Sequence, residues 1–102
     1  MSIPNSTKRE RRPIHPGEIL REEFLAPLGL TQKHLADHIG HDVKVINRIV
    51  NGRSGVTAEM AIKLAAALGT TPEFWLNAQK AVDLYAARQR IRKLPKRLPA
   101  AR

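Results

Sequence analysis

One feature constrains the fold of this 102-residue chain more than any other. It is a pair of short segments, separated by a glycine, in which apolar residues recur at the spacing of an α-helix. Two helices that cross at a steep angle need a small residue in the first, a left-handed residue at the turn, and two apolar residues from the second to fill the crossing. The segment 32–39 and its successor supply these as Ala36, Gly40, Ile46 and Ile49. This spacing predicts a helix-turn-helix motif, with a purely structural helical hairpin as the alternative.

Start and stop signals predict three further helices. Pro16 suits a first helical position, and Pro27 and Gly29 end the helix that it begins. The residues expected to cap the other four helices are Thr31, Asp42, Thr57 and Thr71. The predicted ranges are 16–26, 32–39, about 43–51, 58–68 and 72 to about 94. Because no alternating β-branched pattern occurs, we expect an all-α fold of five helices.

Charge divides the chain into three parts. Residues 1–14 carry four basic residues and one acidic residue, and residues 88–102 carry seven basic residues and no acidic one. The middle, 15–87, holds seven basic and eight acidic residues. We therefore expect a flexible basic arm over 1–14, a folded domain over 15–87, and a basic tail over 88–102 that extends the last helix and then becomes disordered. Such tails either solvate the protein or add non-specific attraction to phosphate backbones.

Several classes of protein are excluded by what the sequence lacks. The chain has no cysteine, and no apolar run approaches the roughly 18 residues that a membrane span needs. Its first residues lack the apolar stretch of a secretory signal, so we expect a cytoplasmic protein that spans no membrane. No glycine-rich phosphate loop or serine-nucleophile motif is present. We accordingly expect one domain, no enzymatic activity and no cofactor.

A cluster of histidines on the first motif helix is a candidate metal site, because histidines four residues apart share a helix face. The cluster consists of His34, Asp37, His38 and His41. We interpret it as a polar helix face and expect no bound metal.

The second motif helix is expected to lie in the major groove of double-stranded DNA, with its outward residues near its N-terminus at the base edges. Lysine and arginine suit guanine, and valine can contact only a thymine methyl. The predicted base-reading residues are Val43, Lys44, Asn47 and Arg48. Phosphate contacts are predicted for Gln32, Arg53, Ser54 and Thr57.

Four stretches of the chain resemble the HigA family of antitoxins, which are XRE-type, lambda-repressor-like helix-turn-helix proteins. They are His15-Pro16-Gly17-Glu18-Ile19-Leu20, Gly29-Leu30-Thr31-Gln32, Asn51-Gly52-Arg53 and Thr71-Pro72-Glu73-Phe74-Trp75-Leu76-Asn77. The resemblance implies a homodimer that binds a palindromic operator and pairs with a HigB-type toxin, a ribosome-dependent mRNA endonuclease. The sequence departs from the family at Asp42-Val43-Lys44-Val45, where family members carry more hydroxyl and amide side chains.

A partner or dimer interface is predicted at Trp75, because aromatic residues anchor interfaces, although core packing explains it equally well. Glu18, Glu22 and Glu23 form an acidic cluster on the first helix that would suit a basic toxin, or would merely keep that helix soluble. The runner-up function is a solitary XRE-type transcriptional regulator without a toxin. Either protein would act at the bacterial nucleoid.

Overall fold

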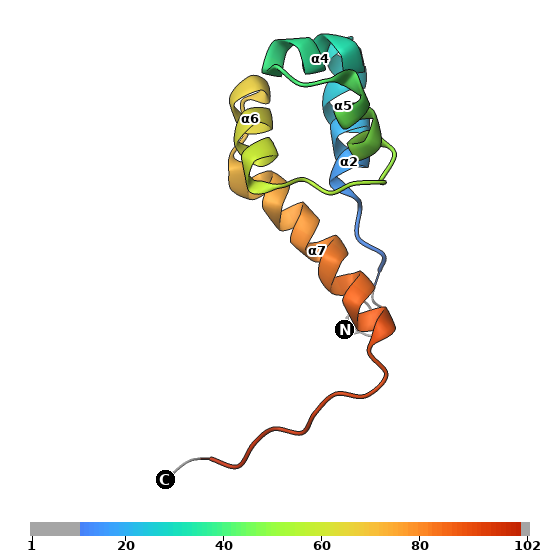
Figure 1. The fold of residues 1–102 in the computed structure, drawn as a ribbon, viewed down its shortest axis with the longest axis vertical. Helices are drawn as coiled ribbons and strands as arrows, with labels where there is room; N and C mark the ends of the chain where they lie inside the picture. Colours follow the sequence, from blue (N-terminus) through green and yellow to red (C-terminus); the bar gives the residue numbers. More distant parts are fainter. Residues whose placement is uncertain (1–10, 101–102) are drawn as a thin grey trace, which may run out of the picture.

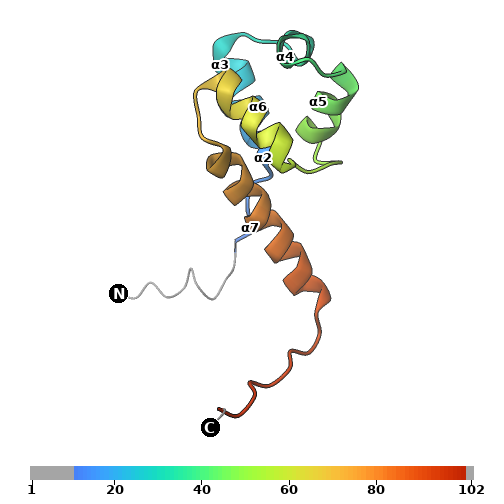
Figure 2. The ribbon, with the colours of Figure 1, turned by 60° about the vertical axis from the view of Figure 1, so that its left-hand side comes forward.

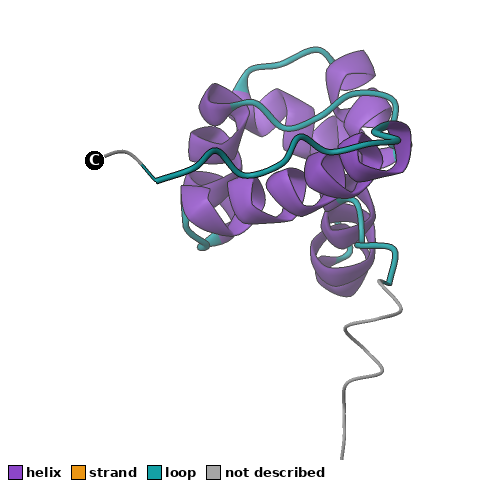
Figure 3. Ribbon diagram, turned by 90° about the horizontal axis from the view of Figure 1, so that it is seen from below, coloured by secondary structure: helices purple, strands orange, loops and turns teal. Residues whose placement is uncertain are grey.

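The computed structural model describes residues 11–100, and this part of the chain is helical and without strands (Figure 3). The first helical segment comprises α2 (Pro16–Ile19), the π-helical turn η1 (Leu20–Leu25) and α3 (Ala26–Leu28). Four helices follow: α4 (Gln32–Ile39), α5 (Val43–Val50), α6 (Ala58–Leu68) and α7 (Pro72–Arg90). The first segment, α4, α5, α6 and the start of α7 gather around the core, and the rest of α7 extends away from them (Figures 1 and 2). The predicted all-α fold of five helices is confirmed.

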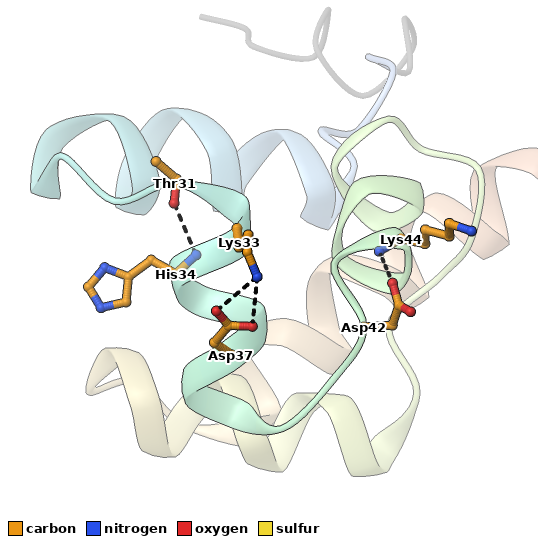
Figure 4. A network of polar contacts seen from close by, with 6 residues as sticks. All are labelled: Thr31, Lys33, His34, Asp37, Asp42 and Lys44. Atoms are coloured by element: carbon orange, nitrogen blue, oxygen red, sulfur yellow. Dashed lines mark hydrogen bonds and ion pairs between the residues drawn. The ribbon is translucent and has the colours of Figure 1, made fainter.

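The last four helices begin at the residues predicted to cap them. The Thr31 hydroxyl accepts a hydrogen bond from the His34 backbone N–H at 3.0 Å, and the Asp42 carboxylate accepts one from the Lys44 N–H at 2.8 Å (Figure 4). Thr57 and Thr71 cap α6 and α7 in the same way. Each cap satisfies an N–H that the first turn of a helix leaves without a partner.

The first helical segment contains a wide turn and ends later than predicted. Ala26 N–H donates to the Arg21 carbonyl five residues earlier, and the segment continues through Pro27 to Gly29, where φ is +66°. In a regular α-helix the Pro27 ring would clash with the carbonyl of Glu23, four residues before it. The wider turn relieves this clash, so the proline does not end the helix.

The core is centred on Trp75 of α7. Its side chain is fully buried, and its indole N–H donates to the Thr70 hydroxyl at 2.7 Å. The Phe24 and Phe74 rings pack against it with centroids 5.4 and 5.0 Å away. Leu20 and Leu64 are also large, fully buried side chains of this core. The aromatic cluster therefore joins the first helical segment to the start of α7.

The N-terminal end of α2 lies directly on the backbone of α5. A Cβ added to Gly17 would stand 1.7 Å from the Ile49 carbonyl oxygen, so only glycine fits at this contact. His15 caps α2, with its Nδ1 accepting a hydrogen bond from the Gly17 N–H at 2.9 Å. The close approach at Gly17 holds α5 against α2.

The last helix ends at Arg90, four residues before the predicted limit, and Ile91 already has an extended backbone. Residues 91–100 are irregular and exposed.

Residues 11–15 run beside the C-terminal half of α7, where Pro13 and Tyr85 both line two cavities of about 350 and 670 Å³ (Figure 1). The rest of the predicted arm, 1–10, and residues 101–102 lie outside the described residues. Between residues 11 and 100, no helix is both long enough and apolar enough to cross a membrane.

Candidate nucleic-acid interface

The predicted crossing of two helices is present between α4 and α5. Ala36 and Ile46 are fully buried, Ile49 is 2% exposed, and Gly40 has a φ of +77° in the left-handed region. The small Ala36 side chain lets the second helix approach, and the two isoleucines fill the space between the helices. All four positions therefore have the roles that the sequence predicted for a helix-turn-helix.

The outward face of α5 carries the predicted base-reading residues. Lys44, Asn47 and Arg48 are exposed, and Lys44 extends from the first turn of the helix (Figure 4). Val43 differs from them, because it is half-buried and packs partly against the core. Only part of the Val43 side chain is therefore left for a thymine methyl.

Hydrogen bonds between three amide side chains connect the first residue of α4 to the C-terminal half of α5. Asn47 Nδ2 donates to Gln32 Oε1 at 3.0 Å, and Asn51 Nδ2 donates to Asn47 Oδ1 at 3.2 Å. The predicted phosphate contact Gln32 and the predicted base contact Asn47 therefore touch each other. Asn51, the C-cap of α5, belongs to the Asn51-Gly52-Arg53 stretch but was not among the predicted DNA contacts.

The loop after α5 carries the other predicted phosphate contacts and is held by a residue that the sequence did not reveal. Gln79 Oε1 on α7 accepts a hydrogen bond from the Val56 N–H at 2.9 Å, and its amide covers Gly55, where a Cβ would stand 2.9 Å from it. Arg53 and Thr57 are exposed on either side of this anchor, and Ser54 is half-buried. Gln79 lies 23 residues from Val56 in the sequence, and no local pattern indicates their contact.

Two residues of the histidine cluster, Asp37 and His41, have polar neighbours other than a metal. Asp37 pairs with Lys33 at 3.2 Å, and the His34 ring lies away from this pair (Figure 4). His41 Nε2 lies 3.1 Å from Lys63 Nζ on α6. Within residues 11–100, no group of three or more His, Cys, Asp or Glu residues is arranged to hold a metal ion.

The residues predicted for a partner interface have different environments. Trp75 has no exposed surface, so its predicted interface role is corrected: the indole belongs to the core. Phe74 beside it is 41% exposed, so a partner can reach its ring. Glu18, Glu22 and Glu23 are all exposed on the first helical segment, and Glu22 pairs with Arg21 at 3.1 Å.

The buried crossing of α4 and α5 and the basic outward face of α5 define a helix-turn-helix protein. Residues 20–75 match the helix-turn-helix family model. Antitoxin HigA-1 of Vibrio cholerae is 53% identical over 83 residues, which are 81% of this chain and 78% of that protein. An uncharacterised helix-turn-helix transcriptional regulator of Haemophilus influenzae is 49% identical over 74% of this chain and 70% of its own length.

Solved structures show the same fold. The Pseudomonas aeruginosa antitoxin HigA, solved with the higBA promoter, superposes with a TM-score of 0.74 at 40% identity, covering 76% of this chain and 85% of that chain. Together these matches show that the chain belongs to the HigA family of XRE-type helix-turn-helix antitoxins. The family that the sequence analysis predicted is confirmed.

Proposed function

We propose that this protein is a DNA-binding antitoxin that represses its own operator and neutralises a HigB-type mRNA endonuclease. The observation that carries the proposal is the exposed pair Lys44 and Arg48 on α5, in a helix-turn-helix that is 53% identical to antitoxin HigA-1. The HigA of Pseudomonas aeruginosa has been solved with promoter DNA, which supports the same kind of ligand here.

DNA readout divides between two groups of side chains. Lys44 and Arg48 donate to guanine acceptors in the major groove, with Asn47 beside them. Gln32 and the residues Arg53, Ser54 and Thr57 hold the DNA backbone and fix the position of α5. One short helix reads few bases, so useful specificity requires a second copy of the chain. We therefore propose a homodimer on a palindromic operator whose half-sites lie about one helical turn, or roughly 34–36 Å, apart.

The DNA-binding part of the proposal is tested with K44A and R48A. Each substitution should weaken binding to the operator by about 1–3 kcal/mol and change binding to random DNA much less, because a base contact contributes only at the correct sequence. Lys80 is an exposed lysine on α7, and K80A is the matched control. Equal weakening on both DNAs would contradict base reading, and a footprint over a single half-site would contradict the dimer.

Toxin neutralisation is supported by the charge distribution. An endonuclease that handles mRNA needs a basic substrate path, and the exposed Glu18, Glu22 and Glu23 offer it an acidic surface on the first helical segment. We expect a small basic toxin to be encoded beside this gene. Co-expression of this protein with that toxin should relieve the growth arrest that the toxin causes and give a complex on gel filtration. Arrest that persists without a complex would contradict the antitoxin function.

A solitary transcriptional regulator is the second candidate, and the 49% identity to a helix-turn-helix transcriptional regulator of Haemophilus influenzae favours it. Operator binding without a toxin gene beside it would select this candidate. Under both candidates the protein acts by binding rather than by catalysis, needs no cofactor, and works in the cytoplasm at the nucleoid.

A further inference from the structure

The amides of Asn51, Asn47 and Gln32 form a chain of hydrogen bonds with a direction. Each amide offers an NH₂ donor and a carbonyl acceptor. Asn51 donates to the Asn47 oxygen at 3.2 Å, and Asn47 donates to the Gln32 oxygen at 3.0 Å. The terminal group is therefore the NH₂ of Gln32. A phosphate oxygen requires a donor, and an amide oxygen turned toward it would be repelled.

The residues at the two ends of this hydrogen-bond network, Asn51 and Gln32, have their backbones held at the ends of helices. The Asn51 N–H donates to the Asn47 carbonyl at 3.0 Å, which holds Asn51 on the last turn of α5. Gln32 is the first residue of α4, directly after the Thr31 cap. Only side-chain torsions remain free, and the two amide hydrogen bonds restrain them before any ligand binds. Restraint of this kind lowers the entropy that DNA binding would otherwise cost.

We propose that Asn51 is a positioning residue for DNA binding that acts through Asn47, so that the NH₂ of Gln32 is presented to a backbone phosphate. Asn51 orients Asn47, and Asn47 orients Gln32. One hydrogen-bond network thereby orients both the base-facing residue Asn47 and the phosphate-facing residue Gln32. The inference rests on the proposed DNA-binding function and adds to it a residue outside the predicted contacts.

The test is a double-mutant cycle on a duplex that the wild-type protein selects from a randomised pool. N51A should weaken binding by about 3- to 10-fold, the effect of one hydrogen bond. In an N47A background, N51A should cause no further weakening, because the connection to Gln32 is already broken. Q89A, which removes an exposed amide from α7, should leave binding unchanged. A full N51A effect in the N47A background would mean that Asn51 contacts DNA itself and would overturn the proposal.

A second readout needs no DNA. Gln32 and Asn51 are two hydrogen bonds apart, so N51A should shift the side-chain NH₂ signals of Gln32 in an amide NMR spectrum, and should not shift them in the N47A background. An unshifted Gln32 signal in both backgrounds would overturn the proposal. If the shift is present but the wild-type protein selects no duplex, the DNA-binding function fails while the amide network stands.

Discussion

Gly17 is required by space rather than by backbone conformation. A Cβ at Gly17 would meet the Ile49 carbonyl, which is backbone, whereas a Cβ at Gly55 would meet only the end of the flexible Gln79 side chain. Gly29 and Gly40 differ, because a Cβ at either would meet nothing within 4 Å, but both have positive φ. A glycine-to-alanine change therefore tests the contact between α2 and α5 at Gly17, and backbone strain at Gly29 and Gly40.

Replacing Gly17 with alanine sets two effects against each other. Alanine favours a helix over glycine by about 0.5–1 kcal/mol. The new Cβ would stand 1.7 Å from the Ile49 oxygen, against the 3.4 Å or more of an ordinary contact, so α2 would have to move away from α5. The steric clash costs more than the helix propensity of alanine gains. We therefore expect G17A to lower the free energy of unfolding by about 2–3 kcal/mol in urea denaturation.

The matched substitution is G29A, where the added methyl group meets no neighbour and only the left-handed backbone is strained. It should cost about 1–2 kcal/mol and leave the α2 contact with α5 intact. A G17A protein as stable as the wild type would show that α2 shifts freely on α5.

At the scale of the helices, local signals predicted most of the fold. The caps Thr31, Asp42, Thr57 and Thr71 and the αL glycines Gly40 and Gly69 specify where helices begin and end, because capping acts within a few residues. The crossing of α4 and α5 could be predicted because its four residues lie within one short stretch.

What the sequence did not reveal depends on contacts between distant residues or on choices between equal alternatives. Gln79 reaches Val56 from another helix, and the wide turn before Pro27 has no cap-like signal. Trp75 suits a core or an interface by composition alone, and only its complete burial decides between them. The helix end at Arg90 also differs from the prediction, since the residues that follow are exposed and gain nothing from continuing the helix.

Gln79 should stabilise the loop that carries Arg53. In Q79A the Val56 N–H would stay buried without an acceptor, which costs about 1–3 kcal/mol, and faster hydrogen exchange of the Val56 amide would report the opening. Gln79 also donates to Asp83 at 3.0 Å on the exposed side. D83A removes only that exposed bond, so it should change stability by less than about 0.5 kcal/mol. Equal effects of the two substitutions would contradict the anchoring role.

Over the whole molecule, charge is separated by location. The folded middle is nearly neutral, the three glutamates Glu18, Glu22 and Glu23 lie exposed on the first helical segment, and basic residues dominate both ends of the sequence. Such a molecule can attract DNA and a basic protein on different surfaces.

Removing the basic tail should weaken DNA binding without changing its specificity. A chain that ends at Arg90 keeps all of α7 and omits Arg92, Lys93, Lys96, Arg97 and Arg102. Its binding to operator and random DNA should fall together, and the salt dependence should flatten by roughly 0.9 for each phosphate that the tail no longer neutralises. Titrations at several salt concentrations measure both quantities. A changed ratio of operator to random affinity would mean that the tail reads sequence.

Reversing the charges of Glu18, Glu22 and Glu23 should slow association with the proposed toxin. With lysine at all three positions, we expect the association rate at low salt to fall about ten-fold, because complementary charge steers encounter. Stopped-flow kinetics of the purified pair would measure it. The difference should shrink in high salt, where surface charges are screened. An unchanged rate at low salt would remove these glutamates from the interface.

Because Pro13 and Tyr85 line the same two cavities, the segment by which the polypeptide enters the domain runs beside the helix by which it leaves. A domain with adjoining entry and exit is suited to insertion into a surface loop of a host protein, because neither end must be stretched to join the host. The DNA-reading helix would then be carried into the host as part of one inserted unit.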